Sequence, residues 1–158
     1  MPKNAAALLS SLFGWSTNSP QRAVLLLRSL LRFLIGLMLL EYGSSKLFEF
    51  PVSLSHGEPL TPLIYASGVI ETIAGSLLSL GLFTRIAAFV LSGEMAVVYF
   101  DYFLPRSPWP SINGGDLSIS WCFTLLYITA VGGGSYGIDS IAREAWLKRR
   151  SASRKTAM

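Results

Sequence analysis

The chain has 158 residues, of which 51% are hydrophobic and only 14% are charged, with a mean hydropathy of +0.49. This composition excludes an ordinary soluble domain, in which about a quarter of the residues are charged. The formal net charge of +4 comes largely from a basic C-terminal tail, which favours a bilayer with anionic lipid over nucleic acid as a partner. We therefore expect an all-α integral membrane protein of about four spans of roughly 20 residues each, without a second domain.

Residues 1–22 form the N-terminal segment. Leu8, Leu9, Leu12 and Phe13 recur at helical spacing, which suits a short helix in the membrane interface. A disordered tail fits the same residues, and both interpretations stay open. No apolar core followed by a small-residue cleavage site is present, so we expect no cleaved signal peptide.

Four apolar stretches follow, over about residues 23–47, 63–83, 86–103 and 118–136, and together they make a four-helix membrane domain over residues 23–140. Arg28 and Arg32 lie early in the first stretch, and we expect them to snorkel toward one headgroup layer. The second stretch carries small residues on which membrane helices pack closely, namely Ser67, Gly68, Ala74, Gly75 and Ser79.

The connections between the stretches differ in length. Residues 48–62 and 104–117 are rich in Pro, Gly and Ser and predict turns, with Trp109 as an interfacial anchor and Asn113 at the start of an Asn-Gly-Gly turn. A tight turn at Thr84 and Arg85 predicts an antiparallel hairpin of the second and third helices. We expect residues 132–136 to extend the fourth helix, and Asp139 to cap a short helix that leads into the basic tail, residues 141–158.

Lysine and arginine predict the orientation, because positive residues near short connections stay in the cytoplasm. Eleven of the 13 lie in the N-terminal flank, at Arg85 or in the C-terminal tail. The other two connections hold only Arg106, with Lys46 at the end of the first helix. Both termini are therefore expected in the cytoplasm, in an up-down antiparallel bundle.

Three carboxylates lie inside the apolar stretches, where an unpaired charge costs several kcal/mol. At about 1.5 Å rise per residue, Glu71 and Glu94 lie about 12 Å from opposite faces and approach each other near the midplane, and Glu41 lies about 9 Å from the outer face. We expect a polar cluster of these three with Lys46 above them, and Lys46 paired with Glu71 or with Glu49. Protonated Glu side chains that only make packing more specific explain the same residues.

Other residue types exclude several kinds of site. Cys122 is the single cysteine and His56 the single histidine, so neither a disulfide nor a cluster of metal ligands is expected. Axial ligands for haem or an iron–sulfur cluster are missing for the same reason. Residues 132–134 are three glycines without Walker spacing or a preceding strand, and we interpret them as a helix end.

Several short motifs together resemble the DoxX family of small four-helix membrane proteins. They are GSSKLF at residues 43–48, GVIE at 68–71, LGLFTR at 80–85, the segment with Trp-Pro and Asn-Gly-Gly at 109–115, and a glycine-rich run that ends in Asp139. The order and spacing of these motifs carry the resemblance. Family members often have His where this chain has Tyr42, and a phenol does not titrate near neutral pH.

The resemblance implies a multi-pass protein of a bacterial inner membrane, with relatives in thiosulfate:quinone oxidoreductases and in other quinone-linked redox complexes. Our first hypothesis is a redox subunit that binds a quinone or a small anionic substrate at Glu71, Lys46 and Glu94, with Glu41 and Tyr42 as further candidates. Any enzymatic activity would be that of a quinone-linked oxidoreductase subunit, and electron transfer would need a redox partner protein or the quinone itself. Arg85, Trp109 and Asn113 are assigned to topology or the interface.

Two other classes of function stay open. The first is a scaffold or receptor that holds partner proteins at the membrane, as distant relatives do as cargo receptors. The second is a small transporter, for which four helices are few without a homo-oligomer.

Overall fold

The computed structural model describes residues 20–52 and 61–156, and these residues contain helices and no strand. Residues 1–19 of the N-terminal segment predicted over residues 1–22 lie outside the described residues, as does the loop that holds His56. The helices are α2 (Pro20–Phe48), α3 (Pro62–Leu80), α4 (Thr84–Val98) with a π-helical continuation η1 (Tyr99–Phe103), α5 (Pro110–Asn113), α6 (Asp116–Val131) and α7 (Ile138–Thr156).

Three of these helices are long and apolar enough to cross a membrane, namely Gln21–Phe48, Pro62–Leu80 and Thr84–Phe103. They confirm the first three predicted stretches. The fourth, α6, is apolar but has only 16 residues, about 24 Å of helix. The predicted extension over residues 132–136 is wrong, because Gly132 and Gly134 adopt left-handed φ values of 85° and 86° that end the helix. The interpretation of the three glycines as a helix end is confirmed.

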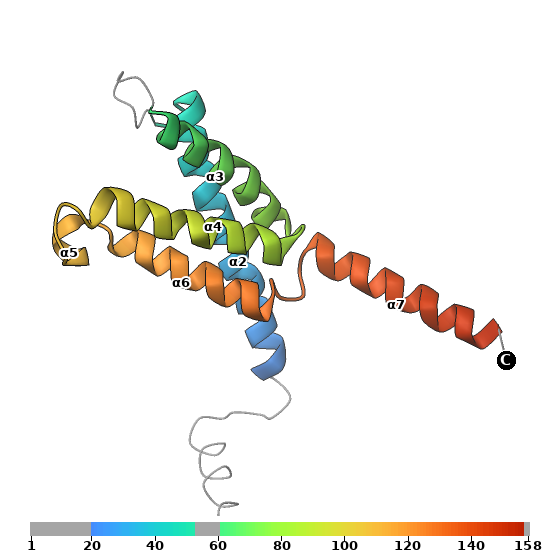
Figure 1. Ribbon diagram of the computed structural model, residues 1–158. Helices are drawn as coiled ribbons and strands as arrows, with labels where there is room; N and C mark the ends of the chain where they lie inside the picture. The colour runs from blue at the N-terminus through green and yellow to red at the C-terminus, as the bar shows by residue number, and fades with distance from the viewer. Residues whose placement is uncertain (1–19, 53–60, 157–158) are drawn as a thin grey trace, which may run out of the picture.

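The helices associate in two pairs, α2 with α3 and α4 with α6 (Figure 1). In this view α4 and α6 lie side by side and run across α2, and the red helix α7 extends away from both pairs. Ser92 of α4 donates a 2.8 Å hydrogen bond to the Cys122 carbonyl of α6. Helices α3 and α4 also contact each other, so the two pairs form one core.

Glycines hold α2 and α3 at very short separation. A Cβ atom on Gly36 would lie 2.6 Å from the Ser79 backbone nitrogen, and one on Gly43 would lie 2.5 Å from the Thr72 backbone nitrogen. On the facing helix, a Cβ on Gly75 would lie 2.8 Å from the Leu40 nitrogen. The small residues predicted on the second helix therefore do form a packing surface, as is usual where membrane helices approach closely.

The turn between α3 and α4 lies three residues earlier than predicted. Gly81 and Phe83 adopt left-handed φ values of 69° and 48°, and Thr84 and Arg85 are already the first residues of α4. The Gly81 N–H donates to the carbonyls at the end of α3, as in common glycine-terminated helices. The sequence motif marks the turn, but the glycine rather than Thr84 makes it.

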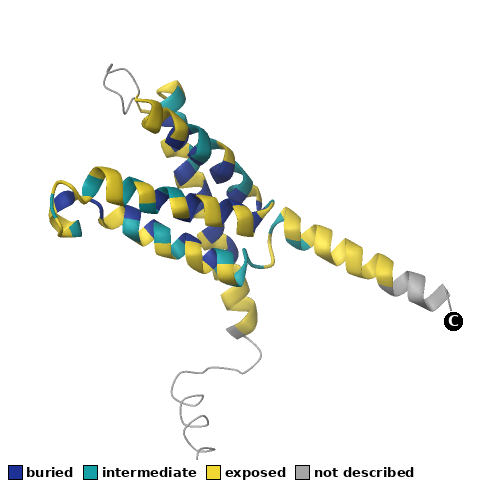
Figure 2. Ribbon diagram, viewed as in Figure 1, coloured by how far each residue is buried: buried dark blue, intermediate teal, exposed yellow. Residues whose placement is uncertain are grey.

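Buried side chains gather where the two pairs face each other, and residues 141–150 of α7 are exposed (Figure 2). The core consists of aliphatic residues with one Met and one Trp. Leu39 of α2, Leu78 of α3, Leu91 of α4 and Leu125 of α6 are fully buried at its centre. The remaining large apolar side chains on these helices are exposed, as expected for surfaces that face lipid.

Arg32 does not snorkel, which corrects the sequence-based expectation. Its side chain is only 4% exposed, and it donates to the carbonyls of Leu78 and Ser79 at the end of α3 and to those of Gly133 and Tyr136 in the loop before α7. The Leu78 carbonyl also accepts the Gly81 N–H, and all four carbonyls lie at the end of α3 or in the loop. A buried guanidinium with five donors reaches them all at once. Arg32 thereby ties this loop to α2 and α3.

Asp139 has a different role from the predicted one. Its carboxylate accepts hydrogen bonds from the N–H groups of Phe83 and Thr84, at 3.0 and 2.8 Å, and so caps α4 rather than its own helix. Burial alone would raise the pKa of Asp139, but the bonds from Thr84 and Phe83 and the charge of Arg32 lower it overall. The loop and the start of α7 are thus fixed to the end of the core that holds the α3–α4 turn.

Candidate functional site

A buried ion pair joins α2 to α3. Lys46 Nζ lies 2.7 Å from Glu71 Oε2, and the Glu71 side chain is only 2% exposed, whereas that of Lys46 is 18% exposed. Lys46 lies in the last turn of α2, and Glu71 lies nine residues into α3, about 14 Å along the helix. Of the two partners predicted for Lys46, the structure confirms Glu71.

Ser67 extends this pair to α4. Its hydroxyl accepts a 2.8 Å hydrogen bond from Lys46 Nζ and donates a 2.6 Å hydrogen bond to Glu94 Oε1. From the sequence, Ser67 was expected only as a small packing residue. Its spacing of four residues from Glu71 places both on one face of α3, and that spacing is the signal that was overlooked. Lys46, Ser67, Glu71 and Glu94 are called the polar cluster below.

Glu94 Oε2 is buried and has no hydrogen-bond partner among the residues that the structure describes. Buried carboxylate oxygens are nearly always paired, so an orphan oxygen needs a proton, a water or a ligand. The polar cluster also contains two carboxylates and one ammonium group. Inside a bilayer such an excess of acid is costly unless one carboxylate carries a proton or accepts one from a ligand.

Glu41 and Tyr42 lie outside the polar cluster, which corrects the expectation for Glu41. The Glu41 side chain is exposed on α2, on a different face from Lys46. Tyr42 is 37% exposed and packs edge-to-face against Trp121 of α6, with ring centroids 5.4 Å apart. The five-residue spacing between Glu41 and Lys46 rotates them by about 140° beyond a full turn, which explains the separation.

The residues assigned to topology or the interface lie at the two ends of the core. Arg85 is exposed at the start of α4, beside the loop that contains Gly132. Trp109 is 66% exposed in the connection before α6. Asn113 is buried in the same connection. Its side-chain amide donates a 2.7 Å hydrogen bond to the Ser107 carbonyl and accepts a 2.7 Å hydrogen bond from the Gly115 N–H, so its role there is structural.

The described residues contain no group of three or more His, Cys, Asp or Glu side chains that could hold a metal ion. Cys122 is half-buried against Ser92. Within the described part of the chain, the chemistry available at the polar cluster is therefore hydrogen bonding, ion pairing and proton exchange.

Comparison with known proteins identifies a family and a relative of this chain. The profile of the DoxX family matches residues 27–103, the part of the chain that contains all four members of the polar cluster. An uncharacterized protein from Haemophilus influenzae is 37% identical over 115 residues, which cover 70% of this chain and 86% of that protein. No solved structure matches the chain. On the strength of the profile match and this relative, the chain belongs to the DoxX family, and its apolar helices make it a multi-pass membrane protein.

Proposed function

We propose that the chain is a subunit of a quinone-linked redox complex in a bacterial inner membrane, and that the polar cluster is its quinone site. The observation that supports this proposal most is the buried, unpartnered Oε2 of Glu94 in a network that already holds one more acid than base. Such a network accepts one proton readily, and quinone chemistry couples electrons to protons.

The geometry offers one group for each redox state of a quinone. The hydroxyl of a quinol would donate to Glu94 Oε2. The carbonyl of an oxidised quinone would accept from Lys46, which has three N–H donors and uses two of them on Glu71 and Ser67. A small anion is less well suited, because the charge of Lys46 is already balanced by Glu71. Oxidation of a quinol releases two electrons and two protons: the electrons would pass to a partner redox protein, one proton to Glu94 and the other to water.

The proposed topology has four spans with both termini in the cytoplasm. The positive residues support this orientation, with Arg32 and Arg85 at one end of the core and Lys46 at the other. Helix α6 is shorter than the roughly 30 Å of bilayer hydrocarbon, and thinning of the bilayer around it would accommodate the difference. In this arrangement the polar cluster lies in the outer half of the membrane.

Quinone binding by the full-length protein in nanodiscs tests the proposal. A short-chain ubiquinone is titrated, and quenching of tryptophan fluorescence gives the dissociation constant. Glu94→Gln and Lys46→Met should each weaken binding by at least about tenfold, the loss of one charged hydrogen bond. Glu41→Gln is the matched control, since it makes the same chemical change on an exposed face and should leave binding unchanged. Absence of binding, or equal binding by all variants, refutes the quinone site.

A scaffold that holds a partner protein is the second candidate, and the observation that favours it is α7. This 19-residue helix extends away from the core and its residues 141–150 are exposed (Figure 1). Crosslinking should then recover a stable partner whose yield falls when α7 is deleted and is unaffected by Lys46→Met. If crosslinking of the partner is lost in Lys46→Met but is retained when α7 is deleted, the result favours the redox assignment instead.

A further inference from the structure

A cavity of about 580 Å³ lies at the other end of α2 from the polar cluster. The start of α2, the α3–α4 turn, the loop before α7 and the first turns of α7 line this open cavity. Four arginines from three helices line it: Arg28 and Arg32 from α2, Arg85 from α4 and Arg143 from α7. Two carboxylates of α7, Asp139 and Glu144, also line it. The wall therefore carries more positive than negative charge.

Two of the lining groups are already committed to the fold. The Arg32 guanidinium donates hydrogen bonds to carbonyl groups of α3 and of the loop. The Asp139 carboxylate accepts hydrogen bonds from the N–H groups of Phe83 and Thr84. They form a fixed wall of the cavity. Hydrogen bonds within the fold hold both residues in place, without a ligand in the cavity.

The other arginines have donors to spare. Arg28 Nε is buried and has no hydrogen-bond partner among the described residues. Arg85 lies beside the glycine loop, since a Cβ on Gly132 would lie 3.7 Å from its Nε and Nη2 atoms. No salt bridge joins Arg28, Arg85 or Arg143 to a carboxylate among the described residues. Unpaired guanidinium groups around a cavity are suited to an anion with several oxygens.

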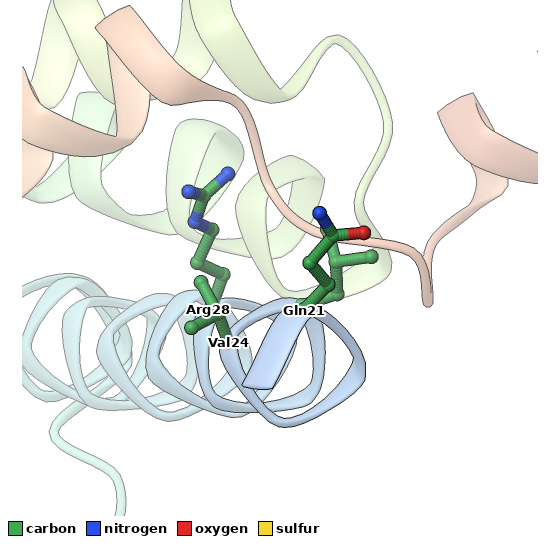
Figure 3. Close-up of a pocket in the computed structure, with 4 residues that line it drawn as sticks. Gln21, Val24 and Arg28 are labelled. Atoms are coloured by element: carbon green, nitrogen blue, oxygen red, sulfur yellow. The ribbon is translucent and has the colours of Figure 1, made fainter. Parts of the chain in front are cut away.

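A second, mainly apolar cavity of about 370 Å³ adjoins the first, because Leu25 and Arg28 line both. Gln21 and Val24 complete its lining. In Figure 3, Arg28 and Gln21 project from the same side of α2, with the ribbon of the loop before α7 passing beyond them. An anion site that continues into an apolar groove along a membrane helix fits a headgroup with its acyl chain.

We propose that the arginine-lined cavity binds a phosphate group through Arg28, Arg85 and Arg143, and that this phosphate belongs to an anionic phospholipid whose chain lies along Val24 and Leu25. Basic pockets between membrane helices on the cytoplasmic side are suited to such headgroups. The bound lipid would join α2, α4 and α7 at the point where Arg32 and Asp139 already hold the loop. This site is separate from the polar cluster, so it stands or falls independently of the quinone proposal.

The test is lipid retention by the full-length protein. Protein purified in neutral detergent is titrated with phosphatidylglycerol, phosphatidylcholine or inorganic phosphate, and bound ligand is counted by native mass spectrometry. Phosphatidylglycerol should bind at least about tenfold more tightly than phosphatidylcholine. Arg28→Gln with Arg85→Gln should weaken its binding by about 25-fold, since one basic residue near anionic lipid contributes roughly a fivefold factor.

Control variants distinguish binding at this cavity from attraction to the overall positive charge of the protein. Arg106→Gln removes a guanidinium that lies 3.9 Å from the Tyr102 ring centroid at the other end of the core, and Arg150→Gln removes one on α7 outside the cavity. Both should bind like the wild type. The Arg28→Lys/Arg85→Lys variant keeps both positive charges and should recover most of the affinity that the double glutamine variant loses. Binding by the wild type should weaken at high salt.

Three results would overturn the proposal. Equal binding of phosphatidylglycerol and phosphatidylcholine would rule out recognition of the anionic headgroup. Equal loss in Arg106→Gln would show that binding follows overall charge. Inorganic phosphate binding as tightly as the lipid, with the same loss in the double variant, would uphold the phosphate site but overturn its assignment to a lipid.

Discussion

The carboxylate of Asp139, the second residue of α7, accepts a 2.8 Å hydrogen bond from the backbone N–H of Thr84, the first residue of α4. A helix N-terminus has four N–H groups without a helical acceptor, and here a residue 55 positions away supplies one. The glycine loop and α7 are therefore held in place by the same contact that stabilises α4.

Asp139→Ala should lower the free energy of unfolding by about 1 kcal/mol, the usual contribution of a capping carboxylate. Denaturant unfolding in detergent measures this change, and limited proteolysis should cut the loop before α7 sooner. Glu144→Ala removes an exposed carboxylate from the same helix and serves as the control. Equal effects of the two substitutions would show that Asp139 acts only through its charge on α7.

The contribution of Asp139 should also depend on pH. Its pKa in the folded protein lies below the ordinary value of 3.8, because the bonds from Thr84 and Phe83 outweigh the effect of burial. A lowered folded pKa adds stability that is fully present above the unfolded value and is lost as pH falls through the folded value. The difference in unfolding temperature between wild type and Asp139→Asn should be constant above about pH 5 and shrink below pH 3.8. A difference that grows on acidification would contradict this assignment.

Gly43→Ala should destabilise the protein, because its new Cβ would lie 2.5 Å from backbone and side-chain atoms of Thr72. Forcing α2 and α3 apart costs about 1–3 kcal/mol, as overpacking of a tight core does. Gly93→Ala provides a matched control on α4, since no atom lies within 4 Å of its added Cβ. The control should be neutral or up to about 1 kcal/mol more stable, because alanine favours helix over glycine. Unfolding temperatures that fall equally for both variants would exclude close packing as the cause.

Lys46→Met should be more destabilising than the double variant Lys46→Met/Glu71→Gln. Removing the lysine alone leaves the buried Glu71 carboxylate without its counter-charge, which costs about 3–5 kcal/mol in buried pairs. Replacing both partners removes the charges together and should restore a large part of that loss. Unfolding in detergent, analysed as a double-mutant cycle, gives the coupling energy, and additive effects would mean that the two side chains do not interact.

Arg32→Lys keeps the positive charge but should still release the loop before α7. One ammonium group cannot reach carbonyls on both α3 and the loop as the planar guanidinium does. Hydrogen exchange at residues 133–137 should accelerate at least about tenfold, which corresponds to the loss of one or two hydrogen bonds. Exchange that is as slow as in the wild type would show that charge alone holds the loop.

Hydropathy was sufficient to predict the first three membrane-crossing helices, but not the residues at which α3 and α6 end. The first three spans follow from apolar length alone. The end of α6 depends on positive φ at Gly132, and the Gly81 turn depends on the carbonyls that Arg32 satisfies. The snorkelling expected of Arg32 failed for the same reason, since a linear pattern does not reveal carbonyls at the end of another helix.

The polar cluster was only partly predictable. Depth along each helix was enough to expect that Lys46 pairs with Glu71 or with Glu49, and the structure shows the pair with Glu71. Rotation about α2 should have removed Glu41, since its face differs from that of Lys46. The spacing of Ser67 from Glu71 places both on one face of α3, but the bond from Ser67 to Glu94 depends on how α4 packs against α3, which the spacing does not reveal.

The tight glycine contacts between α2 and α3 have a structural consequence. These two helices form one closely packed unit, and Ser92 helps to join α4 to α6 as the other. Arg32 and Asp139 link the two units at the α7 end. The hydrogen bond from Ser67 to Glu94 and the edge-to-face contact of Tyr42 with Trp121 also link them. The polar cluster is therefore also part of the contact between the two units.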